Sequence, residues 1–87
     1  MRIIMIKIEF DKKNNRSVAY DNNTEIGECV FLEIEEYWNI IHTQVSSSYQ
    51  GQGIAKKLVE KIIENAKQNN KKLIAECSYA KKLIENM

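Results

Sequence analysis

The chain changes its hydrophobic pattern at one stretch, Ser46-Ser47-Ser48-Tyr49-Gln50-Gly51-Gln52-Gly53-Ile54-Ala55. Before this stretch, apolar and polar residues alternate with the period of two that is typical of half-buried strands. After it, apolar residues from Ile54 to Ala66 recur at the spacing of one face of an α-helix. The stretch therefore joins a predicted strand to the start of the longest predicted helix.

The first half of the chain predicts four strands, at about residues 5–10, 17–20, 25–34 and 37–45. Asn- and Asp-rich or acidic turns separate them, and connections this short join antiparallel neighbours. In the third strand we expect Gly27 to mark a bulge or a close approach of two backbones. We also expect its alternation to place the following residues on one face: Ile26, Val30, Leu32 and Ile34.

The second half predicts a helix that ends near residues 68–70, a buried strand at 72–77 and a short helix. The short helix is indicated by the helical spacing of Ala80, Leu83, Ile84 and Met87. A strand, a helix and a strand with short connections form a βαβ unit whose two strands are parallel. The predicted fold class is α+β: an antiparallel four-strand meander, a helix, a parallel fifth strand and a short C-terminal helix.

Length and composition limit the classes of protein. A chain of 87 residues forms one core, so we expect a single domain over residues 1–87. The net charge is +1 with both signs mixed along the chain, which gives no reason to expect nucleic acid as a partner. No apolar run approaches the roughly 20 residues that span a membrane. We expect a cytoplasmic monomer that is not bound to a membrane.

The glycine stretch itself predicts an anion site. Gly51 and Gly53 would let a ligand approach the backbone, and a helix N-terminus offers unpaired N–H groups with partial positive charge. A tight turn with a glycine cap explains the same spacing. A P-loop is excluded because no Lys-Ser/Thr pair follows, and a dinucleotide fingerprint is excluded because the preceding strand belongs to a meander.

The segment from Gln50 to Ala55 resembles motif A of the GNAT superfamily of N-acetyltransferases, which reads Gln/Arg-x-x-Gly-x-Gly/Ala. Two further segments, His42-Thr43-Gln44-Val45 and Ala75-Glu76-Cys77-Ser78-Tyr79-Ala80, extend the likeness to residues 25–85. Over this range the chain resembles the minimal YjdJ-type subfamily, although many of its members carry proline where this chain has Ser78.

The resemblance implies a minimal GNAT-like fold that binds the thioester acetyl-CoA, or coenzyme A, and transfers an acetyl group to an unidentified amine. An alternative function, favoured by the short chain, is a coenzyme A-binding or acyl-CoA-sensing module without useful catalysis. A third is a small structural domain whose glycines serve only the turn.

The resemblance also implies the cofactor-binding residues. In the superfamily the loop amides and the helix N-terminus hold the pyrophosphate of acetyl-CoA. The matching positions here are Gln50, Gly51, Gln52, Gly53, Ile54 and Ala55. Thr43 and Val45 match strand positions whose backbone pairs with the pantetheine arm. Tyr79 is a weaker candidate, because ordinary packing of an aromatic ring would explain it equally well.

Cys77 admits two interpretations. It could be a buried thiol that packs as a small apolar group. It also precedes a predicted helix with Ser78 as a plausible N-cap, and the helix amides, Lys81 and Lys82 would then stabilise a thiolate. In the subfamily that the chain resembles, the matching cysteine lies near the thiol end of bound coenzyme A. This implies a catalytic candidate, either as nucleophile or as a group near the thiol.

Two further residues are weaker candidates. His42 is the only histidine, and we expect it to share a strand face with Trp38, Ile40 and Gln44. As a general base it would have to reach the acceptor amine. For Cys29 we expect a structural role on the strand face opposite Val30. The two cysteines fit no metal-ligand spacing, so no metal is expected.

Overall fold

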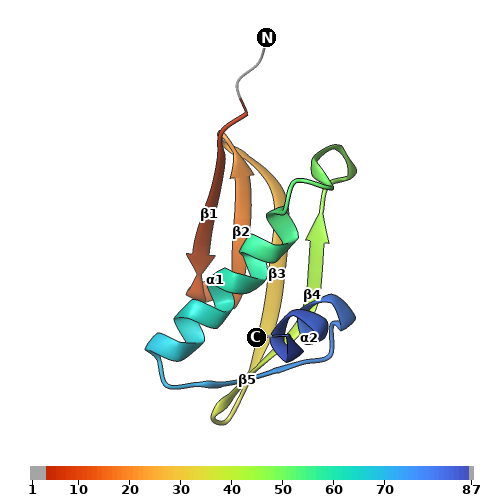
Figure 1. Cartoon of the computed structure of the whole chain (residues 1–87). Helices are drawn as coiled ribbons and strands as arrows, with labels where there is room; N and C mark the ends of the chain where they lie inside the picture. The colour runs from red at the N-terminus through yellow and green to blue at the C-terminus, as the bar shows by residue number, and fades with distance from the viewer. Residues whose placement is uncertain (1–3, 87) are drawn as a thin grey trace.

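The computed structural model describes residues 4–86. Met87, included in the predicted last helix, lies outside them. The elements, in chain order, are β1 (Ile6–Asp11), η1 (Lys12–Asn14), β2 (Arg16–Asp21), β3 (Thr24–Ile34), β4 (Tyr37–Val45), η2 (Ser47–Tyr49), α1 (Ile54–Gln68), β5 (Lys72–Ala75) and α2 (Ser78–Glu85). The strands form one sheet in the order β1-β2-β3-β4-β5 (Figure 1). Strands β1 to β4 are antiparallel and β5 is parallel to β4, so the predicted α+β fold class is confirmed.

The turns of the meander form where the sequence predicts them. Each contains one residue with left-handed backbone: Asn15 (φ 51°), Asn22 (φ 58°) and Glu35 (φ 54°). Asparagine tolerates this conformation better than most residues do. The short connections therefore return the chain beside the strand it has just left.

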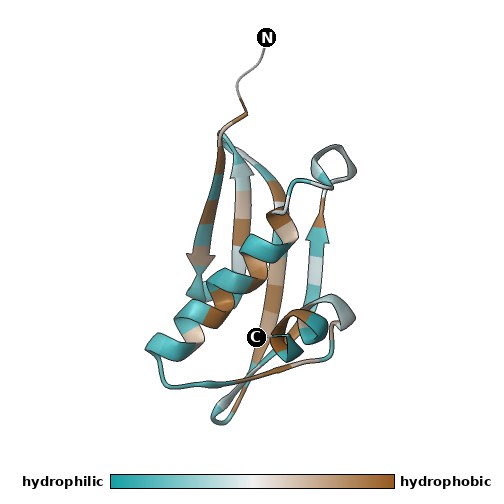
Figure 2. Cartoon of the chain, viewed as in Figure 1, coloured by the Kyte–Doolittle hydropathy of each residue, from teal (hydrophilic) through white to brown (hydrophobic). Residues whose placement is uncertain are grey.

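Both helices pack on the same face of the sheet, as Figure 1 shows. Figure 2 shows the hydrophobic positions gathered along one side of α1, where Leu58 and Ile62 are fully buried. The hydroxyl of Ser17 on β2 donates a hydrogen bond of 2.7 Å to the carbonyl of Leu58. Farther along the sheet, Trp38 stacks on Phe31 with 4.4 Å between ring centroids.

Two bulges set which side chains reach this core. Between β2 and β3, Ala19 pairs with Gly27 and Tyr20 with Glu25, so Ile26 is an extra residue. A bulge reverses the alternation of a strand. Ile26 is therefore buried in the core, whereas Leu32 and Ile34 lie on the opposite face, nearly half exposed. The prediction that Ile26 shares a face with Val30, Leu32 and Ile34 is wrong.

The sequence predicts a bulge or a close approach of two backbones at Gly27, and the structure confirms both. It lies beside the bulge, and a Cβ atom there would come within 3.0 Å of the carbonyl oxygen of Gln44 on β4.

The second bulge lies in β4. Val30 pairs with His42 and Phe31 with Ile40, so Ile41 is the extra residue. His42 consequently lies on the face opposite Trp38 and Ile40, and its expected place beside them is wrong. We call this second face of the sheet, which bears Val30, Leu32, Ile34, His42 and Gln44, the outer face.

The fifth strand is shorter than predicted. Pairing of β4 with β5 ends at Ile40 and Ala75, where the amides of Glu76 and Cys77 both donate to the carbonyl of Ile40, at 2.9 and 3.1 Å. The chain then turns into α2, with Cys77 rather than Ser78 as its N-cap. Strand β4 runs on to Val45 without β5 beside it. No helix in the described range is both long and apolar enough to cross a membrane.

Candidate functional site

A cavity of about 250 Å³ lies where the end of β4, the glycine loop and the first turn of α1 meet. Seven of the residues proposed from sequence to bind a cofactor line it: Val45, Gln50, Gly51, Gly53, Ile54, Ala55 and Tyr79. Tyr79 comes from the first turn of α2, so the cavity lies between the N-termini of both helices. Gln52 and Thr43 are not among the lining residues.

The two loop glycines leave this cavity open. Gly51 and Gly53 have φ angles of 83° and 76°, which L-residues with side chains adopt only with strain. A Cβ at either position would meet no described atom within 4 Å, so it would occupy space that is open to a ligand. Gly53 is the N-cap of α1, and no side chain among the described residues caps that terminus. The helix thus presents backbone N–H groups at the cavity, which suits a phosphate ligand.

Two side-chain hydrogen bonds hold the glycine loop, one from Gln50 and one from Tyr49. The side-chain amide of Gln50 donates to the carbonyl of Val45 at 3.2 Å. The hydroxyl of Tyr49, which also lines the cavity, donates to the buried carboxylate of Asp21 at the end of β2. Sequence reasoning missed Tyr49 as a site residue. No pattern links it to Asp21, which lies 28 positions earlier in the chain.

The strand edge beside the cavity belongs to the last residues of β4. Ser46 donates its amide to the carbonyl of Ile26 on β3. Successive backbone groups of a strand point in opposite directions. The N–H and C=O groups of Thr43 and Val45 are therefore directed away from β3, toward the side that β5 leaves after Ile40. The bond from Gln50 to the Val45 carbonyl comes from this side.

Cys77 lies beside Thr43 at this edge, with 3.5 Å between its sulfur atom and the Thr43 hydroxyl oxygen. Burial opposes ionisation of the thiol. The backbone N–H groups of Ala80 and Tyr79 at the start of α2, together with the hydroxyl and backbone of Thr43, favour the thiolate more than burial opposes it, so the pKa of Cys77 lies below its ordinary value. The sequence also predicts that the ammonium groups of Lys81 and Lys82 stabilise the thiolate, but they are not among the causes that lower its pKa.

The two weaker candidates occupy different surroundings. Cys29 is fully buried on the helix side of β3, opposite Val30, and burial raises the pKa of its thiol to about 11. His42 is exposed on the outer face, where its Nε2 atom lies 3.1 Å from the Oε1 atom of Gln44. It does not line the cavity.

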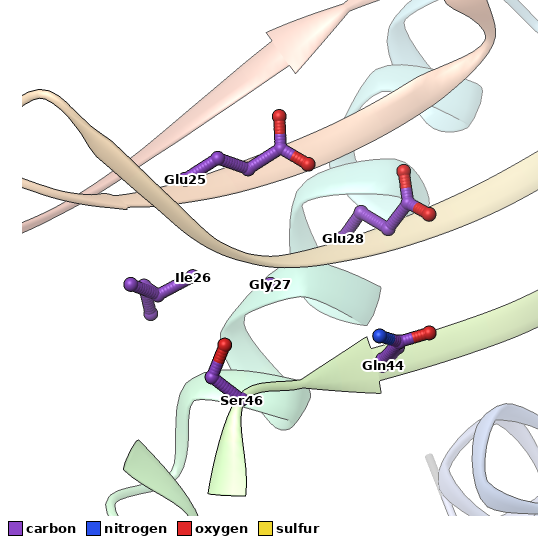
Figure 3. A pocket seen from close by; sticks show the side chains of 6 residues that line it. All are labelled: Glu25, Ile26, Gly27, Glu28, Gln44 and Ser46. Atoms are coloured by element: carbon purple, nitrogen blue, oxygen red, sulfur yellow. The ribbon is translucent and has the colours of Figure 1, made fainter. Parts of the chain in front are cut away.

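A second hollow, of about 100 Å³, surrounds Gly27 (Figure 3). Glu25 and Glu28 line it, and both carboxylates contact the guanidinium of Arg16, at 3.1 and 3.0 Å. The bond to Glu28 is the main cause that raises the pKa of Arg16. A small hollow with two carboxylates at its edge does not suit a phosphate-bearing ligand, so the cavity beside the glycine loop is the candidate site.

Comparisons with known proteins agree with this geometry. The family model described as GCN5-related N-acetyl-transferase matches residues 16–87. A search of the curated proteins found no match. Among solved structures, a GCN5-like protein from Staphylococcus aureus is 35% identical, with a TM-score of 0.68; the match covers 99% of this chain and 82% of that one.

Two more distant structures show the fold alone. The ribosomal-protein-alanine N-acetyltransferase from Brucella melitensis biovar Abortus 2308 is 22% identical (TM-score 0.67), and the match covers 82% of this chain and 60% of that one. The PaiA N-acetyltransferase from Thermoplasma acidophilum, in complex with coenzyme A, is 18% identical (TM-score 0.59), with 62% and 34% covered. The family match over residues 16–87 and the S. aureus structure show that the chain belongs to the GCN5-related N-acetyltransferase family.

Proposed function

We propose that the protein binds acetyl-CoA in the cavity beside the glycine loop and transfers the acetyl group to an amine. One observation carries the proposal: the open backbone of Gly51 and Gly53 and the uncapped start of α1 line the same cavity as Val45 and Tyr79. Membership of the family and the coenzyme A complex of the Thermoplasma relative support it.

Different residues of the chain would bind different parts of acetyl-CoA. The amides from Gly51 to Ala55 would hold the pyrophosphate, because they combine N–H donors with the positive end of the helix. The backbone groups of Thr43 and Val45 would pair with the pantetheine arm along the edge of β4. That edge leads toward Cys77, so the thioester would lie near the Cys77 sulfur.

Acetyl-CoA supplies a thioester carbonyl that an amine can attack. A C–N bond forms, the C–S bond breaks, the amine loses a proton and coenzyme A leaves as its thiol. In a direct route, the chain holds the thioester in place, and an amide of β4 donates to the developing oxyanion. In a covalent route, the Cys77 thiolate first takes the acetyl group as a thioester and then gives it to the amine. The lowered pKa of Cys77 favours the second route.

Two measurements test the proposal. Calorimetric titration of the full chain with acetyl-CoA should show one site. Chromatography should then show free coenzyme A and acetylated product when an amine from a panel of small amines and peptides is added. An absence of calorimetric binding would overturn the proposed site. A mass increase of one acetyl group, lost in Cys77→Ala, would identify the covalent route.

A coenzyme A-binding or acyl-CoA-sensing module without useful catalysis is the second candidate. The chain spans 60% of the length of the Brucella enzyme. Tight binding of acetyl-CoA with no release of coenzyme A to any amine would favour this function over acetyl transfer.

Further features of the proposal follow the sequence. We propose a minimal YjdJ-type member that forms one domain over residues 1–87 and works as a cytoplasmic monomer. Its amine acceptor is unidentified. Light scattering at the concentration used for calorimetry tests the oligomeric state, and a mass of twice 10.2 kDa would contradict the monomer.

A further inference from the structure

Both cysteines of the chain contact one hydroxyl group. The Cys29 sulfur lies 3.4 Å from the Thr43 hydroxyl oxygen, and the Cys77 sulfur lies 3.5 Å from the same atom. Cys29 comes from β3, Thr43 from β4 and Cys77 from the N-cap of α2. The bulge at Ile41 makes this meeting possible, because without it the Thr43 side chain would lie on the outer face.

The number of protons in this group fixes the direction of its hydrogen bonds. A threonine hydroxyl has one proton to donate and two lone pairs to accept with, and a thiolate can only accept. When Cys77 is ionised, the Thr43 proton must therefore point to the Cys77 sulfur. The hydroxyl oxygen is then left to accept from Cys29, whose fully buried thiol keeps its proton at neutral pH.

We propose that Cys29 and Thr43 are positioning residues that favour ionisation of Cys77 through a directed chain of hydrogen bonds, from the Cys29 thiol to the Thr43 hydroxyl to the Cys77 sulfur. In the protonated state, Cys77 donates to Thr43 and the threonine proton turns toward Cys29. Ionisation of Cys77 thus reverses both bonds. No atom is transferred between the three residues. The importance of these hydrogen bonds for acetyl transfer rests on the proposed function. The hydrogen bonds themselves do not depend on it.

Groups from three elements, β3, β4 and α2, surround Cys77. From β3 the group that faces it is Cys29, and from β4 it is Thr43, since His42 lies on the outer face. From α2 the amides of Tyr79 and Ala80 favour the ionised form of the sulfur. The remaining ionisable groups near it in sequence, on Glu76, Tyr79, Lys81 and Lys82, are exposed.

The test measures the pKa of Cys77 in the full chain without any coenzyme A. The rate of alkylation by iodoacetamide is followed against pH, and the Cys77 and Cys29 peptides are separated by mass spectrometry. Thr43→Val removes the hydroxyl while keeping the shape. It should raise the pKa of Cys77 by about one unit, since a hydrogen bond to a charged group is lost. Thr43→Ser should restore most of the wild-type value.

Two variants of Cys29 examine the first bond of the chain. Cys29→Ala should raise the pKa of Cys77 by about half a unit, because the hydroxyl is no longer oriented. Cys29→Ser keeps a donor and should return the value toward wild type. A matched control, Lys82→Gln, should shift it by less. The proposal is overturned if circular dichroism shows that Thr43→Val is folded and the pKa of Cys77 is nevertheless unchanged.

A measurement on the wild-type protein needs no substitution. Since the bonds reverse when Cys77 ionises, the ¹³Cβ resonance of Cys29 should shift with the same pH midpoint as that of Cys77. A Cys29 signal that ignores the ionisation of Cys77 overturns the proposal. All these readouts are taken without acetyl-CoA, so they remain valid if acetyl-CoA binding or acetyl transfer fails.

Discussion

Cys29 links the stability of the protein to alkaline pH. Its pKa rises from 9.0 to about 11 on folding, chiefly because of burial. A raised pKa contributes stability that is complete below the unfolded value and is lost as pH increases beyond it. Between about pH 9 and 11, this thiol should lower the free energy of unfolding by about 1 kcal/mol per pH unit.

Urea denaturation of wild type and Cys29→Ala across this range checks the effect. The wild-type curve should fall more steeply, whatever the constant offset between the two proteins. Cys77→Ala serves as the control. The pKa of Cys77 is lowered and not raised, so removal of this thiol should not abolish the loss of stability at alkaline pH. Parallel curves for wild type and Cys29→Ala would contradict the assignment.

A substitution in the glycine loop should weaken the binding of acetyl-CoA. In Gly53→Val, the new side chain would enter the open space of the cavity at a φ of 76°. Acetyl-CoA should then bind at least tenfold more weakly, a loss of about 1.4 kcal/mol measured by calorimetry. Ser48→Ala, exposed in η2 and outside the cavity lining, is the matched control. Equal affinities in folded proteins would mean that the phosphates bind elsewhere.

Local residue chemistry predicted the glycine loop but not the side chains that complete the site. Two glycines before an amphipathic helix predict a backbone anion site within ten residues of sequence. The contact of Thr43 with Cys29 and Cys77, by contrast, joins residues up to 34 positions apart. It exists because one extra residue in β4 changes the direction of a side chain.

Helix α1 buries its apolar side against the sheet. Ile62 of α1 is fully buried against the sheet, so Ile62→Ala should lower the free energy of unfolding by about 2–5 kcal/mol in denaturant melts. The exposed neighbour Glu64 provides the control, and Glu64→Ala should change it by less than about 0.5 kcal/mol. Similar losses for both variants would mean that α1 does not bury this face.

The strands and helices themselves were predictable from periodicity and turn residues, whereas the bulges were not. In the segment Trp38-Asn39-Ile40-Ile41-His42, either isoleucine could continue the alternation. The choice is made by the pairing of Phe31 with Ile40, which is a property of the neighbouring strand. For the same reason the faces of Ile26 and His42 could not be read from their own strands.

The proposed single domain over residues 1–87 should unfold in one cooperative transition. Calorimetric and van't Hoff enthalpies of unfolding should agree. Acetyl-CoA at a hundredfold excess over its Kd should add about 2.7 kcal/mol of stability and raise Tm by about 10 °C or more in a chain of this size. Two separate transitions would contradict the single domain, and an unchanged Tm would count against acetyl-CoA binding.

The arrangement of the sheet was predictable as far as its connections determine it. A crossover through α1 makes the strands on either side of it parallel, and β5 does lie beside β4 and parallel to it. The early parting of these strands depends instead on the amides of Glu76 and Cys77, which share one carbonyl. No local pattern in the chain signals that shared acceptor.

The aromatic stack in the core gives the protein an optical property of its own. Trp38 is the only tryptophan, is 1% exposed and lies against Phe31. Its fluorescence should therefore appear at short wavelength and resist quenching by acrylamide for as long as β3 and β4 stay paired. Tyr49 and Tyr79 line the cavity instead, so ultraviolet difference spectra in the tyrosine region should respond to acetyl-CoA while the indole emission remains unchanged.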